Sequence, residues 1–209
     1  MAVVITVAQQ KGGTGKTTLA ANLAAALAPS RRVALLDLDP QKSLARWHDL
    51  RRARLREAAA LAFSDTAGWR LPAELERLKR SHDVVLIDSP PQLATDARVA
   101  VRAADLVLVP IQPSMPDVWA AEGTLRLAKE ERRPAHLMFN RTPPASKLRD
   151  AIAADLCERR LPLLRSALGN RAGFAHAFAA GLGVTEAAPR STAAAELRAL
   201  LAELQELTG

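Results

Sequence analysis

The sequence predicts an α/β fold in which a doubly wound, mostly parallel sheet is flanked by helices. Short apolar runs recur along the chain, and they are continuous rather than alternating, as expected for parallel strands covered on both faces. Segments of helical pattern lie between these runs, and this alternation favours a doubly wound sheet. Aromatic residues make up only 3% of the chain, so alanine and leucine fill the core, which favours many helices.

The expected elements alternate in order along the first two thirds of the chain. The strands are the continuous apolar runs VVITVA (3–8), RVALLDL (32–38), DVVLIDS (83–89), DLVLVPI (105–111) and AHLMFN (135–140). The helices are the intervening segments 16–28, 42–60, 72–80, 95–103 and 117–132. Beyond these, the pattern predicts helices over 146–160 and 192–207 and one more edge strand over 161–164. No repeat, linker or break in composition interrupts the chain, so we expect one domain over 1–209.

Composition bounds the class of protein. Apolar residues are 49% of the 209 and charged residues 24%, which is typical of a globular chain. Cys157 is the only cysteine, which excludes an internal disulfide or a cysteine cluster within one chain, and we expect it to be a buried, small apolar residue. The N-terminus lacks the features of a signal peptide, and no apolar run approaches the ~18 residues that span a bilayer, so we expect a cytoplasmic protein.

The stretch QQKGGTGKTT, residues 9–18, carries the clearest chemical signal. It follows the first strand and leads into a helix that begins at Lys16. Glycines such as Gly12, Gly13 and Gly15 let backbone N–H groups turn inward and surround phosphate oxygens, beside the positive end of the helix dipole. The standard phosphate-loop pattern has a glycine where Gln10 stands, but the strand before and the helix after supply the context that the pattern requires.

Individual side chains of this region have predicted roles. Lys16 is expected to reach the β- and γ-phosphates of a nucleotide, the Thr17 hydroxyl to ligate Mg²⁺, and Thr18 to lie nearer the α-phosphate. Asp88 ends a buried strand, where an ionised carboxylate needs a compensating charge, and Mg²⁺ bound through water is a suitable partner. Asp37 also ends a strand, and we expect it to support the metal from a greater distance.

The loop KGGTGKTT resembles the deviant Walker A loop of the ParA/MinD family of ATPases. Further segments resemble that family in the same chain order, and the resemblance covers nearly the whole chain. They are LLDLDPQKS (35–43), VVLIDSPPQL (84–93), LVLVPIQPS (106–114), MFNR (138–141) and RAGFAHAFAAGLGVTE (171–186). The chain starts at the first strand, so it resembles the small ParA subgroup without an N-terminal helix-turn-helix domain.

The resemblance implies an ATP-dependent homodimer that hydrolyses ATP slowly with Mg²⁺ and is stimulated by a ParB-like adaptor. It implies that Gly12–Thr18, Thr14 included, bind the phosphates and that Asn140 and Arg141 lie beside the adenine. Lys11 would reach across to the partner's phosphates and offset charge there, as an arginine finger does. Asp39 would orient the attacking water.

The resemblance also implies that the ATP-bound dimer binds DNA without sequence preference, at the nucleoid. The formal charge of +7, from 29 Lys and Arg against 22 Asp and Glu, is compatible with this role. The candidate contacts in the C-terminal half are Arg141, Lys147, Arg149, Arg165, Arg171 and Arg190. A second basic cluster is Arg46, Arg51, Arg52, Arg54 and Arg56, for which a solvated helix face is the favoured interpretation.

Two other classes on the same scaffold are weighed against this one. MinD-like membrane ATPases end in a basic amphipathic helix, whereas here glutamates outnumber arginine in the last helix, so we expect no membrane binding. Iron–sulfur carriers need several cysteine ligands, which one Cys157 does not provide. The cargo remains open among plasmids, chromosomes and protein complexes.

Overall fold

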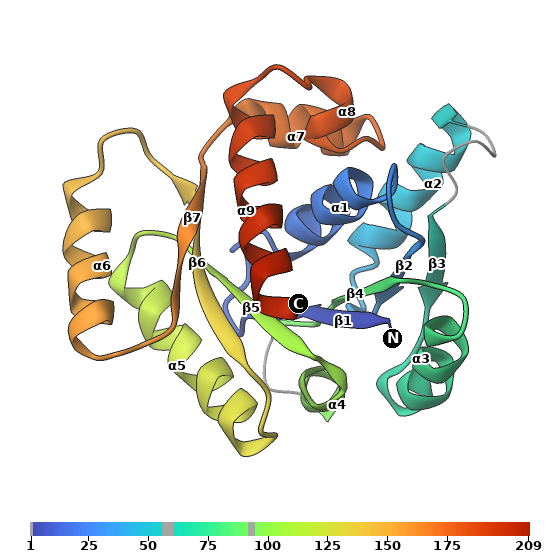
Figure 1. The fold of residues 1–209 in the computed structure, drawn as a ribbon, viewed down its shortest axis with the longest axis horizontal. Helices are drawn as coiled ribbons and strands as arrows, with labels where there is room; N and C mark the ends of the chain where they lie inside the picture. Colours follow the sequence, from blue (N-terminus) through green and yellow to red (C-terminus); the bar gives the residue numbers. More distant parts are fainter. Residues whose placement is uncertain (1, 56–60, 92–94) are drawn as a thin grey trace.

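A computed structural model describes residues 2–55, 61–91 and 95–209, and its centre is one parallel sheet (Figure 1). The seven strands are arranged in the order β3-β2-β4-β1-β5-β6-β7. Their bounds are β1 Val3–Val7, β2 Val33–Asp37, β3 Ala62–Asp65, β4 Val84–Asp88, β5 Leu106–Ile111, β6 Ala135–Thr142 and β7 Leu163–Gly169. All six neighbouring pairs are parallel, which confirms the predicted fold class.

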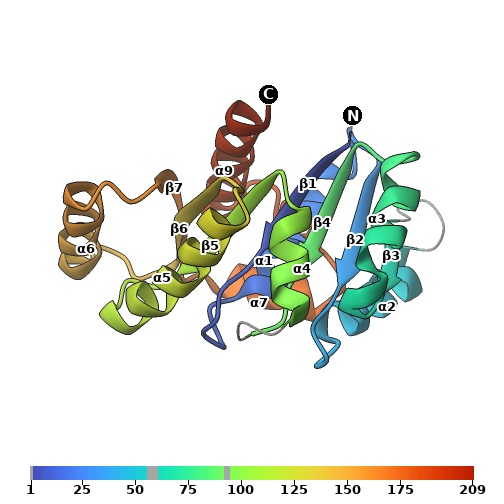
Figure 2. The ribbon, with the colours of Figure 1, turned by 90° about the horizontal axis from the view of Figure 1, so that it is seen from below.

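Helices cover both faces of the sheet, as Figure 2 shows from the side on which α4 and α5 lie in front. The helices are α1 Lys16–Leu27, α2 Ser43–Leu55, α3 Leu71–Lys79, α4 Thr95–Ala103, α5 Met115–Glu130, α6 Lys147–Glu158, α7 Ala172–Ala179, α8 Val184–Ala187 and α9 Thr192–Thr208. One face packs against α1, α2, α7, α8 and α9, and the other packs against α3 to α6. Every residue of β2 and β5 is buried, which is why these strands are continuous apolar runs.

Several boundaries differ from the expected ones for local reasons. The edge strand β3 was not predicted, because the sequence AFSD is half polar and only half buried. β7 begins two residues later than expected and runs on to Gly169. Helix α5 begins two residues early because the Ser114 hydroxyl caps it, accepting a hydrogen bond from the Asp117 N–H at 3.3 Å. Residues 56–60 of the expected helix 42–60 lie outside the described residues.

The expectation that Cys157 is buried was wrong: its side chain is exposed. Helix α6 buries only a narrow stripe, Ile152 and Leu156, against the sheet. Cys157 directly follows Leu156, so it is rotated by about 100° away from that stripe. In the part of the chain that the structure describes, no helix is long and apolar enough to cross a membrane.

The sheet brings one functional edge together. Strand β1 is central, between β4 and β5, and the loop of residues 8–15 leaves its carboxyl end. Asp88 of β4 lies beside Val7 of β1 on one side and beside Asp37 of β2 on the other. Parallel α/β sheets bind ligands outside the carboxyl ends of the strands, at the position where the strand order changes direction. The carboxyl end of β1 lies at that position.

Candidate nucleotide site

The loop after β1 has a backbone conformation that requires glycine. Gly13 and Gly15 have φ angles of +81° and +90°, in the left-handed region. A Cβ atom on Gly15 would lie 2.7 Å from the Asn140 amide nitrogen. Lack of space is therefore a second reason, besides the φ angle, why this position needs glycine. Gly15 is also the N-cap of α1, with no side chain between the first helical N–H groups and a bound anion.

Side chains from the neighbouring strands hold this loop in place. The Asn140 amide, at the end of β6, donates to the Thr14 carbonyl at 2.8 Å. Arg141 and Gln112 both donate to the Gly13 carbonyl, at 3.0 and 3.3 Å. These contacts engage the carbonyl oxygens of Gly13 and Thr14, so the loop N–H groups stay available for an anion.

A buried cation and a buried carboxylate lie at the base of the loop. Lys16 is 6% exposed, and burial lowers the pKa of its ammonium group although Asp88 and Asp39 oppose the shift. Asp88 is fully buried, and burial raises the pKa of its carboxyl to about 7. Asp37 and Asp39 add to that rise, whereas Thr17 and Lys16 oppose it.

The residues around Asp88 fit a magnesium ion. Neither carboxylate oxygen of Asp88 has a hydrogen-bond partner among the described residues. A buried carboxylate without a partner is unfavourable, and a hydrated divalent cation is the kind of group that satisfies it. The Thr17 hydroxyl lies close enough to lower the pKa of Asp88, and Asp37 pairs with Asp88 in the neighbouring strand, so the three residues predicted at the metal belong to one cluster.

The carboxylates of Asp37, the last residue of β2, and of Asp39 already have backbone partners. Asp37 is fully buried and accepts from the Asp39 N–H at 2.9 Å and from the Ala45 N–H at 3.1 Å. Burial raises the pKa of Asp37, and these two donors oppose the rise. Asp39 accepts from the Gln41 N–H at 2.9 Å and keeps its other oxygen for a further contact. Asp37 therefore shapes the segment that presents Asp39 to the site.

Lys11 forms an ion pair within its own chain. Its ammonium group contacts the Asp117 carboxylate, which is fully buried at the start of α5. Asp117 also accepts from the Gln112 N–H and the Ser114 hydroxyl, each at 2.9 Å. The Lys11 side chain is 41% exposed, so it remains accessible from outside. In this single chain Lys11 is held at the edge of the loop.

A cavity of about 210 Å³ opens beside the phosphate loop. It is lined by Thr18 and Asn22 of α1, by Asn140 and Arg141 at the end of β6, and by the 168–175 segment. Arg141 has a φ angle of +53°, a conformation that is uncommon for arginine and that aims its guanidinium back at the loop. The cavity thus joins the predicted phosphate residues to the predicted base residues.

The basic residues proposed to contact DNA fall into two groups in the structure. Arg165, Arg171 and Arg149 are held by carboxylates, Arg171 at 2.6 Å from Glu196. Lys147 and Arg190 are exposed and have no ion pair among the described residues.

The cluster on α2 is not a uniformly solvated face. Arg51 is 2% exposed and makes a bidentate pair with Glu186, at 2.7 and 2.8 Å, so its assignment to a surface cluster was wrong. Arg46, Arg52 and Arg54 are exposed, and Arg56 lies outside the described residues.

Sequence reasoning missed two residues that organise the site. Gln112 and Asp117 follow β5, and together they bind the loop carbonyl and Lys11. The available signal was their position after a buried strand that neighbours β1, because polar residues at such strand ends face the same edge.

Fold and loop together define a P-loop type nucleotide-binding domain, built on a parallel sheet with the phosphate loop at the switch point. The chain belongs to the CobQ/CobB/MinD/ParA nucleotide binding family, whose model matches residues 5–206.

Relatives match over most of their length. The "Maintenance of carboxysome distribution protein A" of Halothiobacillus neapolitanus is 31% identical over 203 residues, which are 93% of this chain and 92% of the relative. The protein of the same name from Gloeobacter kilaueensis is 38% identical over 183 residues, 85% and 80% of the two chains. The solved structure of a Cyanothece McdA variant in complex with ATP superposes with a TM-score of 0.79 at 21% identity, covering 98% of this chain and 96% of that one.

Proposed function

We propose that this protein is a Mg²⁺-dependent ATPase that dimerises with ATP, binds DNA without sequence preference in that state and positions a cargo on the nucleoid. The observation that carries the proposal is the second lysine of the loop. Lys16 is buried where it serves its own nucleotide, whereas Lys11 lies at the accessible rim. A cation at the rim suits a site that is completed by another subunit.

The division of labour among the side chains follows from their surroundings. The loop N–H groups and Lys16 bind the phosphates, and the cavity next to Thr18 and Arg141 receives the base. Asp88 and Thr17 would hold Mg²⁺, which when bound offsets phosphate charge. Asp39, presented by Asp37, orients the attacking water, and Lys11 stabilises charge on the partner's transferred phosphoryl group.

The role of Lys11 is tested by mixing two variants. Lys11→Ala should bind ATP but dimerise and hydrolyse poorly, whereas Asp39→Ala should close the dimer and fail at hydrolysis. If Lys11 acts in the partner's site, a heterodimer of the two has one intact site, so mixing should restore part of the ATPase activity. If mixtures shown to contain heterodimers stay inactive, Lys11 acts within its own subunit and this part of the proposal is wrong.

The DNA switch is tested by electrophoretic retardation of unrelated duplexes. ATP should give strong retardation and ADP weak retardation, and affinity should fall steeply with salt because counterions are released. Lys147→Ala and Arg190→Ala, which remove exposed cations without carboxylate partners, should each lower the salt slope by about 0.9. The matched control is Arg80→Ala, an exposed residue directly after α3, which should leave the salt slope unchanged. Equal binding with ADP would overturn the switch.

The alternative of a membrane-associated ATPase is less well supported. The apolar face of α9 packs on the protein itself, through Leu197, Leu200 and Leu204, and Glu203 binds backbone N–H groups of β7. That face is therefore not available for a bilayer. Co-sedimentation of the ATP-bound protein with anionic liposomes, compared with DNA, separates the two classes.

The cargo is a separate part of the proposal. Both relatives reported above are named for carboxysome distribution, and they match along most of their length. This favours a large protein complex, reached through a ParB-like adaptor, over a plasmid. The adaptor should raise the rate of ATP hydrolysis only when DNA is present. If it does not do so in a reconstituted assay, the proposed role of the adaptor is wrong.

A further inference from the structure

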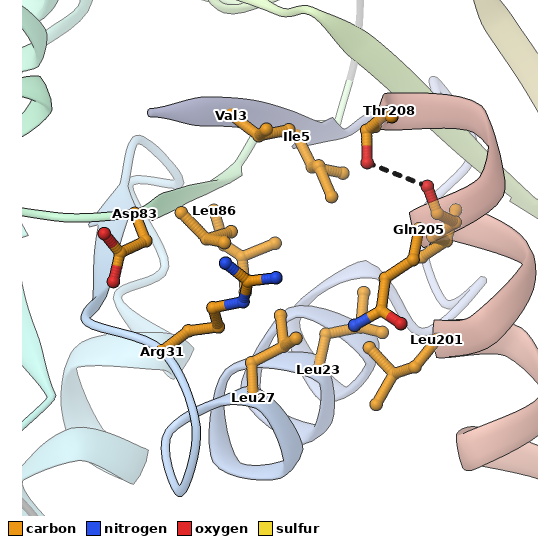
Figure 3. A pocket seen from close by; sticks show the side chains of 13 residues that line it. Val3, Ile5, Leu23, Leu27, Arg31, Asp83, Leu86, Leu201, Gln205 and Thr208 are labelled. Atoms are coloured by element: carbon orange, nitrogen blue, oxygen red, sulfur yellow. Dashed lines mark hydrogen bonds between the residues drawn. The ribbon is translucent and has the colours of Figure 1, made fainter. Parts of the chain in front are cut away.

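A second cavity lies at the opposite end of the sheet from the phosphate loop. Its volume is about 430 Å³, and it opens between the C-terminal halves of α1 and α9, over the first residues of β1 and β4 (Figure 3). The loop leaves the carboxyl end of β1, whereas this cavity lies over its beginning at Val3 and Ile5. It is therefore distinct from the proposed ATP site.

Apolar side chains form most of the lining of the cavity. Its floor and walls come from branched aliphatic side chains of two strands and two helices. They are Val3, Ile5, Leu23, Leu27, Val84, Leu86, Leu201 and Leu204. Leu23 and Leu86 have no exposed surface, and Ile5 and Leu204 have 5% and 2%. These four side chains therefore give the cavity an apolar interior that is little exposed to solvent.

Two exposed polar side chains lie at the cavity, those of Arg31 and Gln205. Figure 3 shows Arg31 and Gln205 reaching toward the cavity from opposite sides. Neither side chain has a hydrogen bond or ion pair among the described residues. The one acidic lining residue, Asp83, is occupied by Arg32, which donates to it at 2.6 Å from Nη2 and 2.9 Å from its backbone N–H. Arg31 makes no ion pair among the described residues, although its charge helps to lower the pKa of Asp83, and its exposed guanidinium can still meet an external anion.

We propose that this cleft binds a small amphiphilic carboxylate, such as a medium-chain fatty acid. The chain would lie against Leu23, Leu27 and Leu201, and the carboxylate would accept hydrogen bonds from Arg31, with Gln205 as a second donor. A guanidinium matches a carboxylate in shape and charge, and ligand pockets commonly combine apolar walls with a few such groups. The volume of about 430 Å³ falls within the roughly 300–1,000 Å³ that is typical of small-molecule sites.

Isothermal titration calorimetry with decanoate, below its micelle concentration, tests the site on the full chain. Saturable binding at one site is expected, and octanoate should bind roughly ten times more weakly, since each methylene contributes about three- to fourfold. Arg31→Gln should weaken decanoate binding about tenfold and leave 1-decanol unaffected, because only the carboxylate uses the guanidinium. The control Arg80→Gln removes an exposed arginine elsewhere and should change neither.

A second variant tests the apolar part. Leu201 is half-buried at the wall, so Leu201→Phe should narrow the cavity and abolish decanoate binding, with thermal unfolding showing that the fold is retained. The proposal is overturned by any of three results: no saturable binding to the wild type, equal affinity for decanoate and decanol, or unchanged decanoate affinity in Arg31→Gln.

Discussion

At the scale of single residues, the phosphate loop depends on Gly15 for two separate reasons. A Cβ atom there would meet Asn140, and the φ angle of +90° would strain any other residue. We expect Gly15→Ala to lower the free energy of unfolding by about 1–2 kcal/mol even without nucleotide. Gly12→Ala is the control, since nothing lies within 4 Å of its added Cβ. Denaturant titrations of both proteins measure the difference, and equal stabilities would contradict this account.

The ion pair between Lys11 and Asp117 leads to a second prediction at this scale. Holding Lys11 within its own chain opposes any contact that it makes with a partner, so Asp117→Asn should favour the dimer. Weakening one ion pair by about 1 kcal/mol corresponds to roughly a fivefold change, and we expect the dimer constant with ATP to tighten by about that factor.

Analytical ultracentrifugation measures this dimer constant. Ser114→Ala is the control, because it removes another Asp117 contact and leaves the Lys11 pair in place. A weaker dimer in Asp117→Asn than in this control would show that the pair assists association.

At the scale of secondary-structure elements, α8 and the residues before it hold α2, the helix that follows Asp39, in place. Arg51 of α2 pairs with Glu186 of α8, and Trp47 donates to the Leu182 carbonyl at 3.3 Å. Burial raises the pKa of Glu186, but its hydrogen bonds to Arg51 and the Gly183 N–H outweigh burial, so the net pKa is lowered. The pair is therefore ionised at neutral pH.

Breaking this pair should be strongly destabilising. Arg51→Met leaves a partly buried carboxylate without its cation, so we expect a loss of about 3 kcal/mol in the free energy of unfolding. Arg77→Met is a matched control: Arg77 also pairs with a glutamate at 2.7 Å, but it is 63% exposed, and its removal should change stability by less than about 1 kcal/mol. Urea denaturation compares them, and similar losses would refute the distinction.

Most elements could be predicted from sequence, and the exceptions have physical causes. Buried strands such as β2 and β5 are easy to recognise in the sequence as continuous apolar runs, because both faces of the sheet are covered by helices. Strand β3 lies at the sheet edge and is half polar, so no run marks it. In the site, the glycines and Lys16 follow from a local motif, but the contact of Lys11 with Asp117 joins residues 106 positions apart. A local sequence pattern cannot predict a contact between residues so far apart in the chain. For the same reason it did not predict that Arg51 is buried in a pair with Glu186.

At the scale of the whole molecule, the last helix is part of the core. Helix α9 buries Leu197, Leu200 and Leu204 against α1 and β7. Three buried leucines contribute about 5–9 kcal/mol, which is comparable with the total stability of a typical domain. Deleting residues 192–209 should therefore abolish cooperative thermal unfolding, as followed by circular dichroism.

A shorter deletion provides the control for this experiment. Removing residues 207–209 takes away the exposed Leu207 and leaves the three buried leucines, so a cooperative transition should remain. A cooperative transition in the longer deletion would show that α9 is dispensable for the fold.

The position of β1 has a consequence for how the protein is made. This strand is synthesised before both of its neighbours, which are β4, at residues 84–88, and β5, from residue 106. At about 5–20 residues per second, the first strand waits roughly 4–16 s for a partner to be synthesised. During that interval an apolar segment and the phosphate loop behind it are exposed on a nascent chain. Strand β1 is thus paired late, and chaperone demand should fall on the segment from β1 to β5 rather than on the residues that follow it.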